Sequence, residues 1–383
     1  MLLNSYDSWS PLREVVLGSA DNYTSHEREL SFDIFFHDQA PHSDIYLPRH
    51  VTPGAGPAKQ SPIKERYLEE LREDVEGMAE IFAQLSITVH RPLPLDAETG
   101  SVRTPAFSAA VVPPLNVRDN SIVFGDEIIE TAPLVRSRYF ETQFLKPVYA
   151  EYFRRGARWT VMPRPFMTDA SFDLSYVAGT AGPAQPYSTF EPVTDPQPSP
   201  YDTGFEIMID GAQCLRLGRD VFVNVSNVNH ALGCDWLERH LRGRFRVHRM
   251  HRLADSHIDS TVLALRPGLL LVRNPGIAER LPKALQAWDM IFPPEPEDNN
   301  FPDYDDDDLI LTSRYIDLNV LSVSPDTVMV NAACPELART LEGRGFTVVP
   351  VSHRHRRLFG GGLHCFTLDT VREGSAPEDY LAG

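Results

Sequence analysis

Short β-branched runs alternate along the chain with longer stretches in which apolar residues recur at helical spacing. Five of these runs are about four or five residues long and are bounded by Gly, Asn, Asp or Pro, which is typical of strands. The predicted strands lie at 14–18, 121–125, 220–224, 269–272 and 327–331. Each is followed by a stretch that predicts a helix and then by a second short strand.

The helical stretch at 64–85 shows the periodicity most plainly. Tyr67, Leu71, Val75 and Met78 fall on one stripe of it, as expected for an amphipathic helix. The predicted helices are 64–85, 139–155, 229–242, 277–288 and 334–343, and the second strands lie at 87–91, 159–162, 245–248, 289–292 and 346–349. One strand–helix–strand unit therefore recurs five times.

Five such units spanning the chain favour one closed α/β ring, a single domain over 1–383, rather than several separate domains. A doubly wound sheet also alternates strands and helices, but no Gly-x-Gly-x-x-Gly follows any of the first strands, which weakens a dinucleotide-binding interpretation. Loop insertions are expected near 37–62, 183–200 and 293–308.

The composition restricts the classes of partner and the cellular setting that are expected. The 383 residues include 53 acidic and 36 basic side chains, a formal charge of -17, and so acidic a surface disfavours nucleic acid. Four cysteines are too few for a disulfide framework and predict reduced thiols in the cytoplasm. The first residues lack the basic and apolar regions of a signal peptide, and no stretch approaches the roughly 18 apolar residues of a membrane span.

The segment FGGGLHCFT at 359–367 places Cys365 directly after a run of three glycines. Glycines allow the backbone to approach a ligand closely, and a cysteine there is a candidate nucleophile. The alternative is a Gly-rich turn before a buried strand with an inert core cysteine. That inert role is expected for Cys214, Cys234 and Cys334, which lie in apolar or helical settings.

A nucleophilic cysteine needs an acid or base and a group that orients it. His257 and Asp259 are two residues apart, so in a strand they would share one face. Asp119 and Asp210 each precede the strand of a repeated unit. Each aspartate alone could be a turn residue, but a ring would direct all of them toward one centre.

Several motifs, taken together and in order, resemble the arginine amidinotransferase family of the guanidino-modifying superfamily. The matching segments are Arg118-Asp119, Glu127 to Glu130, Arg136 to Glu141, Leu217 to Asp220, His257 to Thr261, Leu318 to Leu321 and Gly360 to Thr367. The resemblance covers nearly the whole chain. It implies a fivefold pseudosymmetric α/β propeller of strand–helix–strand units around a central active site.

The resemblance also implies the catalytic roles. Cys365 would attack the central guanidino carbon of arginine and release ornithine, and His257 would protonate the leaving amine and later deprotonate the acceptor. Asp210 would orient His257, and Asp119 and Asp259 would hold the guanidinium by paired hydrogen bonds. The implied reaction is ping-pong, with no metal and no organic cofactor.

Further positions match the family's substrate-binding residues. Thr312 and Ser313 correspond to a hydroxyl pair at the mouth of the site. Arg118 and Arg138 correspond to positions used for phosphate in the inosamine branch, but the glycine branch has them too, so they do not identify the acceptor.

One departure concerns the substrate carboxylate. Ile277 stands where the family usually has the arginine that binds this carboxylate, and Arg273 and Arg280 are the nearby candidates to replace it. Plain L-arginine and a related guanidino compound therefore both remain open as the donor.

The predicted activity is transfer of an amidino group from L-arginine, or a related guanidino donor, to a primary amine in specialised-metabolite biosynthesis. Four lysines against 32 arginines point to a GC-rich bacterial genome. The alternatives are a guanidino hydrolase or deiminase that uses water, and a guanidino-binding protein without turnover. Glycine, lysine, an aminocyclitol or another primary amine remain open as acceptors, and the resemblance suggests a homodimer.

Two further segments carry clustered polar residues. Residues 295–308 contain eight acids and no base, which predicts a solvated loop, with an electrostatic funnel for a cationic substrate as the alternative. His353 and His355 alternate with arginines that would repel a metal, so a surface strand is expected there.

Overall fold

The computed structural model describes residues 2–23, 29–35, 63–96, 100–174, 197–254, 256–296, 302, 304, 311–312, 314–374 and 378–381. The predicted insertions at 37–62, 183–200 and 293–308 lie wholly or mostly outside these ranges. Within them, no helix is both long enough and apolar enough to cross a bilayer.

The described residues form five three-stranded sheets and a two-stranded ribbon. The first sheet consists of β17 (Thr367–Arg372), β1 (Leu12–Leu17) and β2 (Thr88–His90), and the second of β5 (Ser121–Phe124), β6 (Glu127–Glu130) and β7 (Arg158–Val161). The third consists of β8 (Cys214–Leu217), β9 (Asp220–Val225) and β10 (Arg246–His251), and the fourth of β11 (Val262–Arg266), β12 (Leu269–Val272) and β13 (Asp289–Ile291). The fifth consists of β14 (Leu321–Ser324), β15 (Thr327–Asn331) and β16 (Thr347–Val351), and the ribbon of β3 (Ser101–Arg103) and β4 (Ser108–Ala110).

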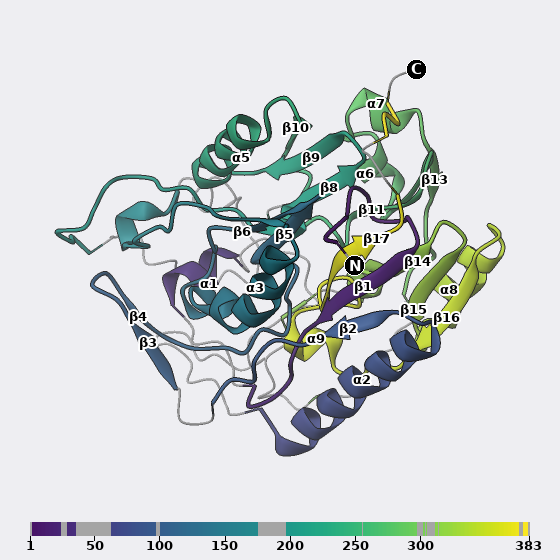
Figure 1. The fold of residues 1–383 in the computed structure, drawn as a ribbon, viewed down its shortest axis with the longest axis horizontal. Coiled ribbons are helices and arrows are strands. Elements are labelled where there is room, and N and C mark those ends of the chain that lie inside the picture. The colour runs from purple at the N-terminus through teal and green to yellow at the C-terminus, as the bar shows by residue number, and fades with distance from the viewer. Residues whose placement is uncertain are drawn as a thin grey trace, which may run out of the picture.

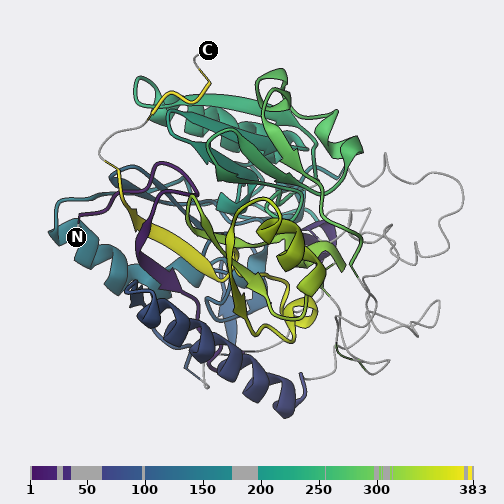
Figure 2. The same ribbon diagram turned by 90° about the vertical axis from the view of Figure 1, so that its right-hand side faces the viewer.

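All five sheets have the same pairing. The central strand is antiparallel to one neighbour and parallel to the other, as in β8–β9–β10. In the first sheet the antiparallel neighbour is β17, from the far end of the chain, which pairs with β1 so that Leu12 faces Arg372. Figure 2 shows β17 and β1 side by side, in yellow and purple.

Each unit thus contains one strand more than the predicted strand–helix–strand pattern. In three units, a turn with a glycine at positive φ (Gly125, Gly218 or Gly268) separates two strands, so the apolar block before the helix is a hairpin. Such two-residue turns require backbone that glycine adopts readily. The predicted strand 121–125 is β5, the antiparallel neighbour of its central strand. The other four predicted strands are the central strands β1, β9, β12 and β15.

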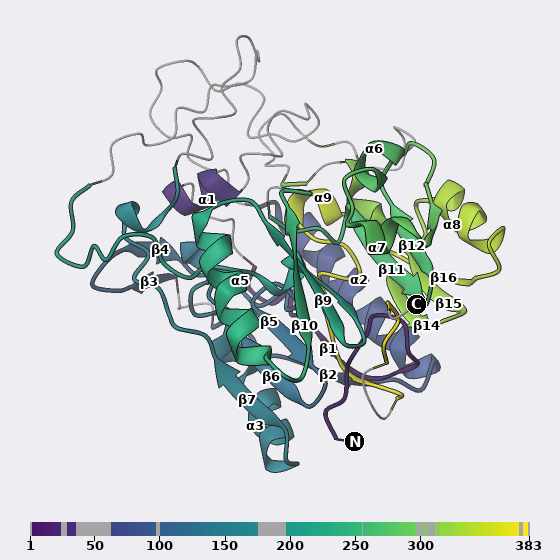
Figure 3. The ribbon, with the colours of Figure 1, turned by 90° about the horizontal axis from the view of Figure 1, so that it is seen from above.

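The main helices pack beside the outer strands of their own units. They are α2 (Glu65–Gln84), α3 (Lys146–Arg154), α5 (Val228–Leu241) and α8 (Pro335–Glu342). Figure 1 shows α2 along β2 and β16, and Figure 3 shows α5 beside β9 and β10. The shorter helices are α1 (Leu30–Phe35), α6 (Pro275–Ala278), α7 (Lys283–Gln286) and α9 (Arg356–Phe359).

Two predicted helices are shorter than expected. The stretch 139–155 contains a 3-10 helix, Glu141–Leu145, before α3, and Pro147 stands in the first turn of α3. The stretch 277–288 is divided into α6 and α7, with Pro282 immediately before α7. Proline cannot donate a helical hydrogen bond and tends to begin a new helix.

The central strands contribute to two hydrophobic clusters each. In β12, Leu269 and Leu271 pack toward the fifth sheet, and Leu270 and Val272 pack toward the third. This alternation is the period of two that a strand imposes on its side chains. A strand that is buried on both faces reads as a continuous apolar run, which is why these segments are visible in the sequence.

Candidate active site

Cys365 lies in the turn that connects α9 to β17, and its side chain is buried. Gly360 has a φ of 69°, and a Cβ atom at Gly361 or Gly362 would lie only 2.0 Å from Asn116 Oδ1 or 2.5 Å from Asn319 Cβ. The three glycines are therefore required by backbone conformation and close packing. The turn brings the thiol to the same place as residues from three other units.

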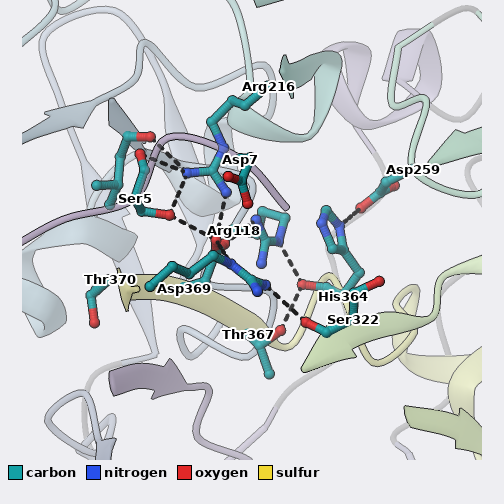
Figure 4. A network of polar contacts seen from close by, with 12 residues as sticks. Ser5, Asp7, Arg118, Arg216, Asp259, Ser322, His364, Thr367, Asp369 and Thr370 are labelled. Atoms are coloured by element: carbon teal, nitrogen blue, oxygen red, sulfur yellow. Dashed lines mark hydrogen bonds and ion pairs between the residues drawn. The ribbon is translucent and has the colours of Figure 1, made fainter. Parts of the chain in front are cut away.

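Two residues hold the backbone around Cys365. Asn319 accepts the Cys365 N–H at 2.9 Å through Oδ1 and the His364 N–H at 3.1 Å through its carbonyl oxygen. From the other side, Arg118 donates its backbone N–H to the Cys365 carbonyl at 3.3 Å and its Nε–H to the His364 carbonyl at 2.8 Å. The Arg118–His364 contact is visible in Figure 4. Asn319 was not predicted as a site residue, although it lies in one of the motifs of the family.

His257 is held by a buried carboxylate. Its Nε2 lies 2.8 Å from Asp210 Oδ2, and its Nδ1 lies 3.9 Å from Asp119 Oδ1. The Asp210 N–H donates to Gln213 Oε1 at 2.8 Å, and the Asp210 side chain accepts from the Gln213 backbone N–H, so Asp210 caps the short 3-10 helix before β8. Burial would lower the pKa of His257, but Asp119 and the hydrogen bond to Asp210 raise this pKa to about 9. The imidazole is therefore protonated near neutral pH and can act as an acid.

Asp259 faces Cys365. Its Oδ2 lies 2.8 Å from His364 Nδ1 and 3.4 Å from Cys365 Sγ. Burial would raise the pKa of Asp259, but the hydrogen bond to His364 and nearby positive charge lower it to about 2. Burial and Arg118 lower the pKa of His364 to about 4, so a neutral His364 donates to a charged Asp259.

The predicted strand that would place His257 and Asp259 on one face is not present. The strand β11 begins at Val262, and residues 256–261 form a turn. His257 contacts Asp210, whereas Asp259 contacts His364. A turn allows these two side chains to reach different partners, which the regular geometry of a strand would not.

Asp119 completes the carboxylate-rich site. Its Oδ2 accepts a hydrogen bond from Arg138 Nη1 at 2.6 Å. Among the described residues, neither Asp119 Oδ1 nor Asp210 Oδ1 has a hydrogen-bond partner, although both atoms are buried. Burial raises the pKa of Asp119, and burial together with Asp259 and Asp119 raises the pKa of the Cys365 thiol well above its usual value. An entering cation would satisfy these carboxylates and lower the thiol pKa.

Arg118 and Arg138 are both buried and have internal partners. Arg138 contacts both oxygens of Glu141, at 2.5 and 2.8 Å, in addition to Asp119. Arg118 forms an ion pair with Asp369 at 2.8 Å. These contacts favour a role in positioning Asp119 and Cys365, and contact of either guanidinium with a substrate stays a prediction.

The structure describes one of the two hydroxyl residues predicted at the mouth of the site. Thr312 is buried and donates to the Arg356 carbonyl at 3.4 Å, whereas Ser313 lies outside the described residues. Ile277 packs against the hydrophobic cluster between the third and fourth sheets.

The two arginines near Ile277 differ in their contacts. Arg273 donates to the Ser260 carbonyl at 3.2 Å, in the turn that carries Asp259. Arg280 instead donates to the Arg252 carbonyl. Arg273 is therefore the better placed of the two for the substrate carboxylate, a role that stays a prediction.

The expected surface strand at His353 and His355 is wrong. Both imidazoles are buried, and β16 ends at Val351. His353 Nε2 lies 2.9 Å from the Gly361 carbonyl, and His355 contacts Glu70 of α2. The flanking arginines suggested exposure, but Arg356 is itself buried and forms a bidentate ion pair with Asp317. Within the described ranges, no group of three or more His, Cys, Asp or Glu side chains is arranged to hold a metal ion.

Comparison with known proteins assigns the chain to a family. No family model matches the chain. The chain is 33% identical over 382 residues to inosamine-phosphate amidinotransferase 1 of Streptomyces griseus, covering 99% of each protein. It is 30% identical over 381 residues to the mitochondrial glycine amidinotransferase of Danio rerio, covering 98% of this chain and 84% of the relative.

Comparison with solved structures indicates the same family. The inosamine-phosphate amidinotransferase of Streptomyces griseus superposes with a TM-score of 0.80 at 30% identity, and an amidinotransferase of the saxitoxin pathway from Microseira wollei with 0.78 at 30% identity, each covering 99% of both chains. A dimethylarginine dimethylaminohydrolase, at 13% identity and a TM-score of 0.52, shares the fold alone. The chain therefore belongs to the amidinotransferase family and is a transferase.

Proposed function

We propose that this enzyme transfers the amidino group of L-arginine to a primary amine through a covalent amidino–Cys365 intermediate. The observation that carries the proposal is the convergence of one buried thiol, one acid–base pair and two further carboxylates. Cys365 Sγ lies 3.4 Å from Asp259, and His257 lies 2.8 Å from Asp210 and 3.9 Å from Asp119. A planar guanidinium has donors on several edges, which suits carboxylates on either side of a thiol.

In the first half-reaction, the guanidinium enters between Asp119 and Asp259 and the thiol loses its proton to solvent. The thiolate attacks the guanidino carbon, so that an S–C bond forms. The C–Nε bond of arginine then breaks as protonated His257 gives its proton to Nε. Ornithine leaves as a neutral amine, and a cationic isothiouronium remains on Cys365 with His257 neutral.

In the second half-reaction, a neutral primary amine attacks the same carbon. His257 takes the proton from the attacking nitrogen, and the S–C bond breaks. A new guanidinium product leaves, and the thiolate and protonated His257 are restored. Asp210 keeps the imidazole oriented and stabilises its charge in both steps, as in other nucleophile–base–orienter sets.

We also infer that the five sheets close into a propeller that is a single domain. In support, one hydrophobic cluster lies between each successive pair of sheets, and a fifth joins the fifth sheet to the first. The site residues come from segments that precede or connect these sheets, so a ring would gather them at its centre. The names of the relatives, which include proteins of inosamine-phosphate and saxitoxin chemistry, support a role in biosynthesis.

Purified enzyme with guanidino-labelled L-arginine and a panel of primary amines tests the proposal. We expect release of ornithine, and label on Cys365 in a tryptic peptide when the amine is left out. Addition of an amine should move the label to a guanidino product. Labelled citrulline or urea formed without an amine would instead identify a hydrolase.

A further inference from the structure

The imidazole of His364 contacts the carboxylate that lies beside the thiol. Its Nδ1 lies 2.8 Å from Asp259 Oδ2 (Figure 4), and Cys365 Sγ donates to the same oxygen at 3.4 Å. Asp259 therefore accepts from two consecutive residues of the Gly-rich turn. The mechanism proposed above uses Cys365 and Asp259 but gives no role to His364.

Asp259 depends on such contacts because its own segment does not fix its side chain. It stands in the turn 256–261, before β11 begins. The backbone of this turn is closed by the N–H groups of Thr261 and Val262, which donate to the Ile258 carbonyl at 2.8 and 2.7 Å. Neither bond involves the carboxylate of Asp259, which is buried and needs donors from elsewhere in the chain.

The backbone of His364 is held firmly enough to supply such a donor. Its N–H donates to the Asn319 carbonyl at 3.1 Å. Its carbonyl oxygen accepts from Arg118 Nε at 2.8 Å and from the Thr367 hydroxyl at 3.1 Å. The side chain is only 9% exposed, so the imidazole is a fixed partner for Asp259.

The donor that His364 presents is uncharged. Burial and the Arg118 guanidinium lower the pKa of His364 to about 4, so the imidazole is neutral near neutral pH. Asp119 is held differently, because Arg138 Nη1 donates to its Oδ2 at 2.6 Å and brings a positive charge. A neutral donor orients a carboxylate without compensating its charge, which then remains available to attract a cation.

Two cationic side chains also act on Asp259 from other segments. They are His257 and Arg118. Each is in direct contact with a different carboxylate, His257 with Asp210 at 2.8 Å and Arg118 with Asp369 at 2.8 Å. The donor in direct contact with Asp259 Oδ2 from the imidazole side is therefore the neutral one.

We propose that His364 is a positioning residue for donor binding: its neutral Nδ1–H holds the Asp259 carboxylate beside Cys365 and leaves the negative charge of Asp259 for the substrate guanidinium. The inference rests on the proposed function, because it takes Asp259 to bind the guanidinium of the donor. His364 acts through Asp259 and takes up no proton in either half-reaction.

Binding of L-arginine and L-citrulline to full-length Cys365→Ser tests this role. The serine hydroxyl keeps a donor to Asp259 but is a much weaker nucleophile, and citrulline carries an uncharged urea in place of the guanidinium. In this background, His364→Leu should weaken arginine binding at least about tenfold and citrulline binding by less than about threefold, because it removes a hydrogen bond to a charged group. His364→Asn places an amide N–H near the position of Nδ1 and should keep the arginine affinity within about threefold. Isothermal titration calorimetry measures both ligands.

A role in packing alone predicts the opposite order of the two variants, since leucine fills the space of the imidazole better than asparagine. Equal losses for arginine and citrulline, or a larger loss of arginine binding in His364→Asn, would overturn the proposal. The matched control is His90→Leu on the outer strand β2, which removes a similar contact, from Nε2 to Glu14 Oε2 at 2.8 Å. It should leave the ratio of the two affinities unchanged, and a similar shift there would count against a local role of His364.

Nitrogen NMR of the wild-type chain checks the neutral donor without a variant at His364. We expect an uncharged imidazole near neutral pH with its proton on Nδ1, and an imidazolium there would overturn the proposal even if His364→Leu does not fold. Ornithine release by the wild-type chain tests the proposed function separately. Loss of arginine preference in His364→Leu without any transfer by the wild type would reject amidino transfer and support the role of His364. Failure of Cys365→Ser to bind arginine would overturn both.

Discussion

Two buried ionic clusters lie on either side of the His364–Cys365 segment, and their compositions are opposite. In the first, Asp119, Asp210 and Asp259 surround His257. In the second, Asp369 is surrounded by three guanidinium groups. Its Oδ2 accepts from Arg372 Nε at 2.7 Å. The same oxygen accepts from Arg216 Nη2 at 2.6 Å, and Oδ1 lies 2.8 Å from Arg118 Nη1 (Figure 4).

The arginine-rich cluster joins segments distant in the sequence. Arg216 also donates to the Val123 carbonyl at 2.9 Å, and Arg372 to the Ser322 carbonyl at 3.0 Å. Burial alone would raise the pKa of Asp369, but the three arginines hold this pKa well below its usual range. The Ser5 hydroxyl adds a further hydrogen bond at 2.8 Å.

The difference lies in which charge is in excess. Three arginines around one carboxylate connect four of the sheets, and their excess positive charge is spread over backbone carbonyls. In the second cluster, Asp369 Oδ1 lacks a hydrogen bond but is paired with the Arg118 guanidinium at 2.8 Å. Three carboxylates around one imidazolium leave Asp119 Oδ1 and Asp210 Oδ1 without hydrogen-bond partners in the described structure. Buried oxygens of this kind are costly unless a ligand satisfies them, so the first cluster suits substrate and the second suits stability.

Removal of the proposed nucleophile should have the largest effect on turnover. Cys365→Ala should lower ornithine release by about 10⁶-fold, the scale seen when a nucleophile is removed from a triad. The thermal midpoint should change by only a few degrees, because a neutral thiol is replaced by a smaller apolar group. Retained activity in this variant would rule out the covalent mechanism.

Substitutions of Asp210 and Asp119 should affect different kinetic parameters. Asp210→Asn should lower kcat by about 10²- to 10⁴-fold, because His257 loses the group that orients and charges it. Asp119→Asn should act mainly on the KM for the guanidino donor. Steady-state kinetics with varied arginine measures both, and equal effects on kcat and KM in the two variants would contradict this division of roles.

In the arginine-rich cluster the expected loss is one of stability. Asp369→Asn would leave three buried guanidinium groups without their carboxylate and should lower the free energy of unfolding by about 3–5 kcal/mol. Urea denaturation measures this. The matched control is Asp126→Asn, whose carboxylate is 57% exposed and pairs with Arg158, and which should cost less than about 1 kcal/mol. Similar losses in both variants would show that the cluster is not structural.

The smallest predicted effect is on the titration of His257. Its folded pKa of about 9 lies above the unfolded value of 6.5, so its stabilising contribution is fully present below pH 6.5 and is lost as the pH rises through 9. NMR titration of the imidazole in the free enzyme should show this midpoint. Asp210→Asn should move it to lower pH, and an unchanged midpoint would argue against the Asp210 contact.

Most of the repeated fold could be predicted from the sequence because the central strands are buried on both faces. Such strands appear as continuous apolar runs, and α2 as a stripe of Tyr67, Leu71, Val75 and Met78. In most units the strand that is antiparallel to the central strand was not predicted. Turns of two residues hardly interrupt the apolar pattern, so β8 and β9 appear as one block on either side of Gly218.

The site residues could be named from local motifs, but the contacts between them could not be predicted in this way. Cys365 and Asp259 are 106 residues apart in sequence, and Arg118 lies 246 residues from the His364 carbonyl that it binds. Local hydrophobic periodicity does not indicate contacts between residues that lie so far apart in the sequence. The Asn319 contact with Cys365 and the burial of His353 likewise depend on side chains from another part of the chain.

The sequence alone determined the alternation of strands and helices, the Gly-rich turn that carries Cys365 and the identity of the acids available to it, because these follow from local spacing and residue type. The tertiary structure alone decided which charges face one another. It placed Arg118 and Arg138 on internal partners, directed His257 to Asp210 and Asp259 to His364, and left two carboxylate oxygens free for a cation. The physical reason is that the energy of a buried charge depends on its neighbours in space, and those neighbours come from units that are distant in the chain.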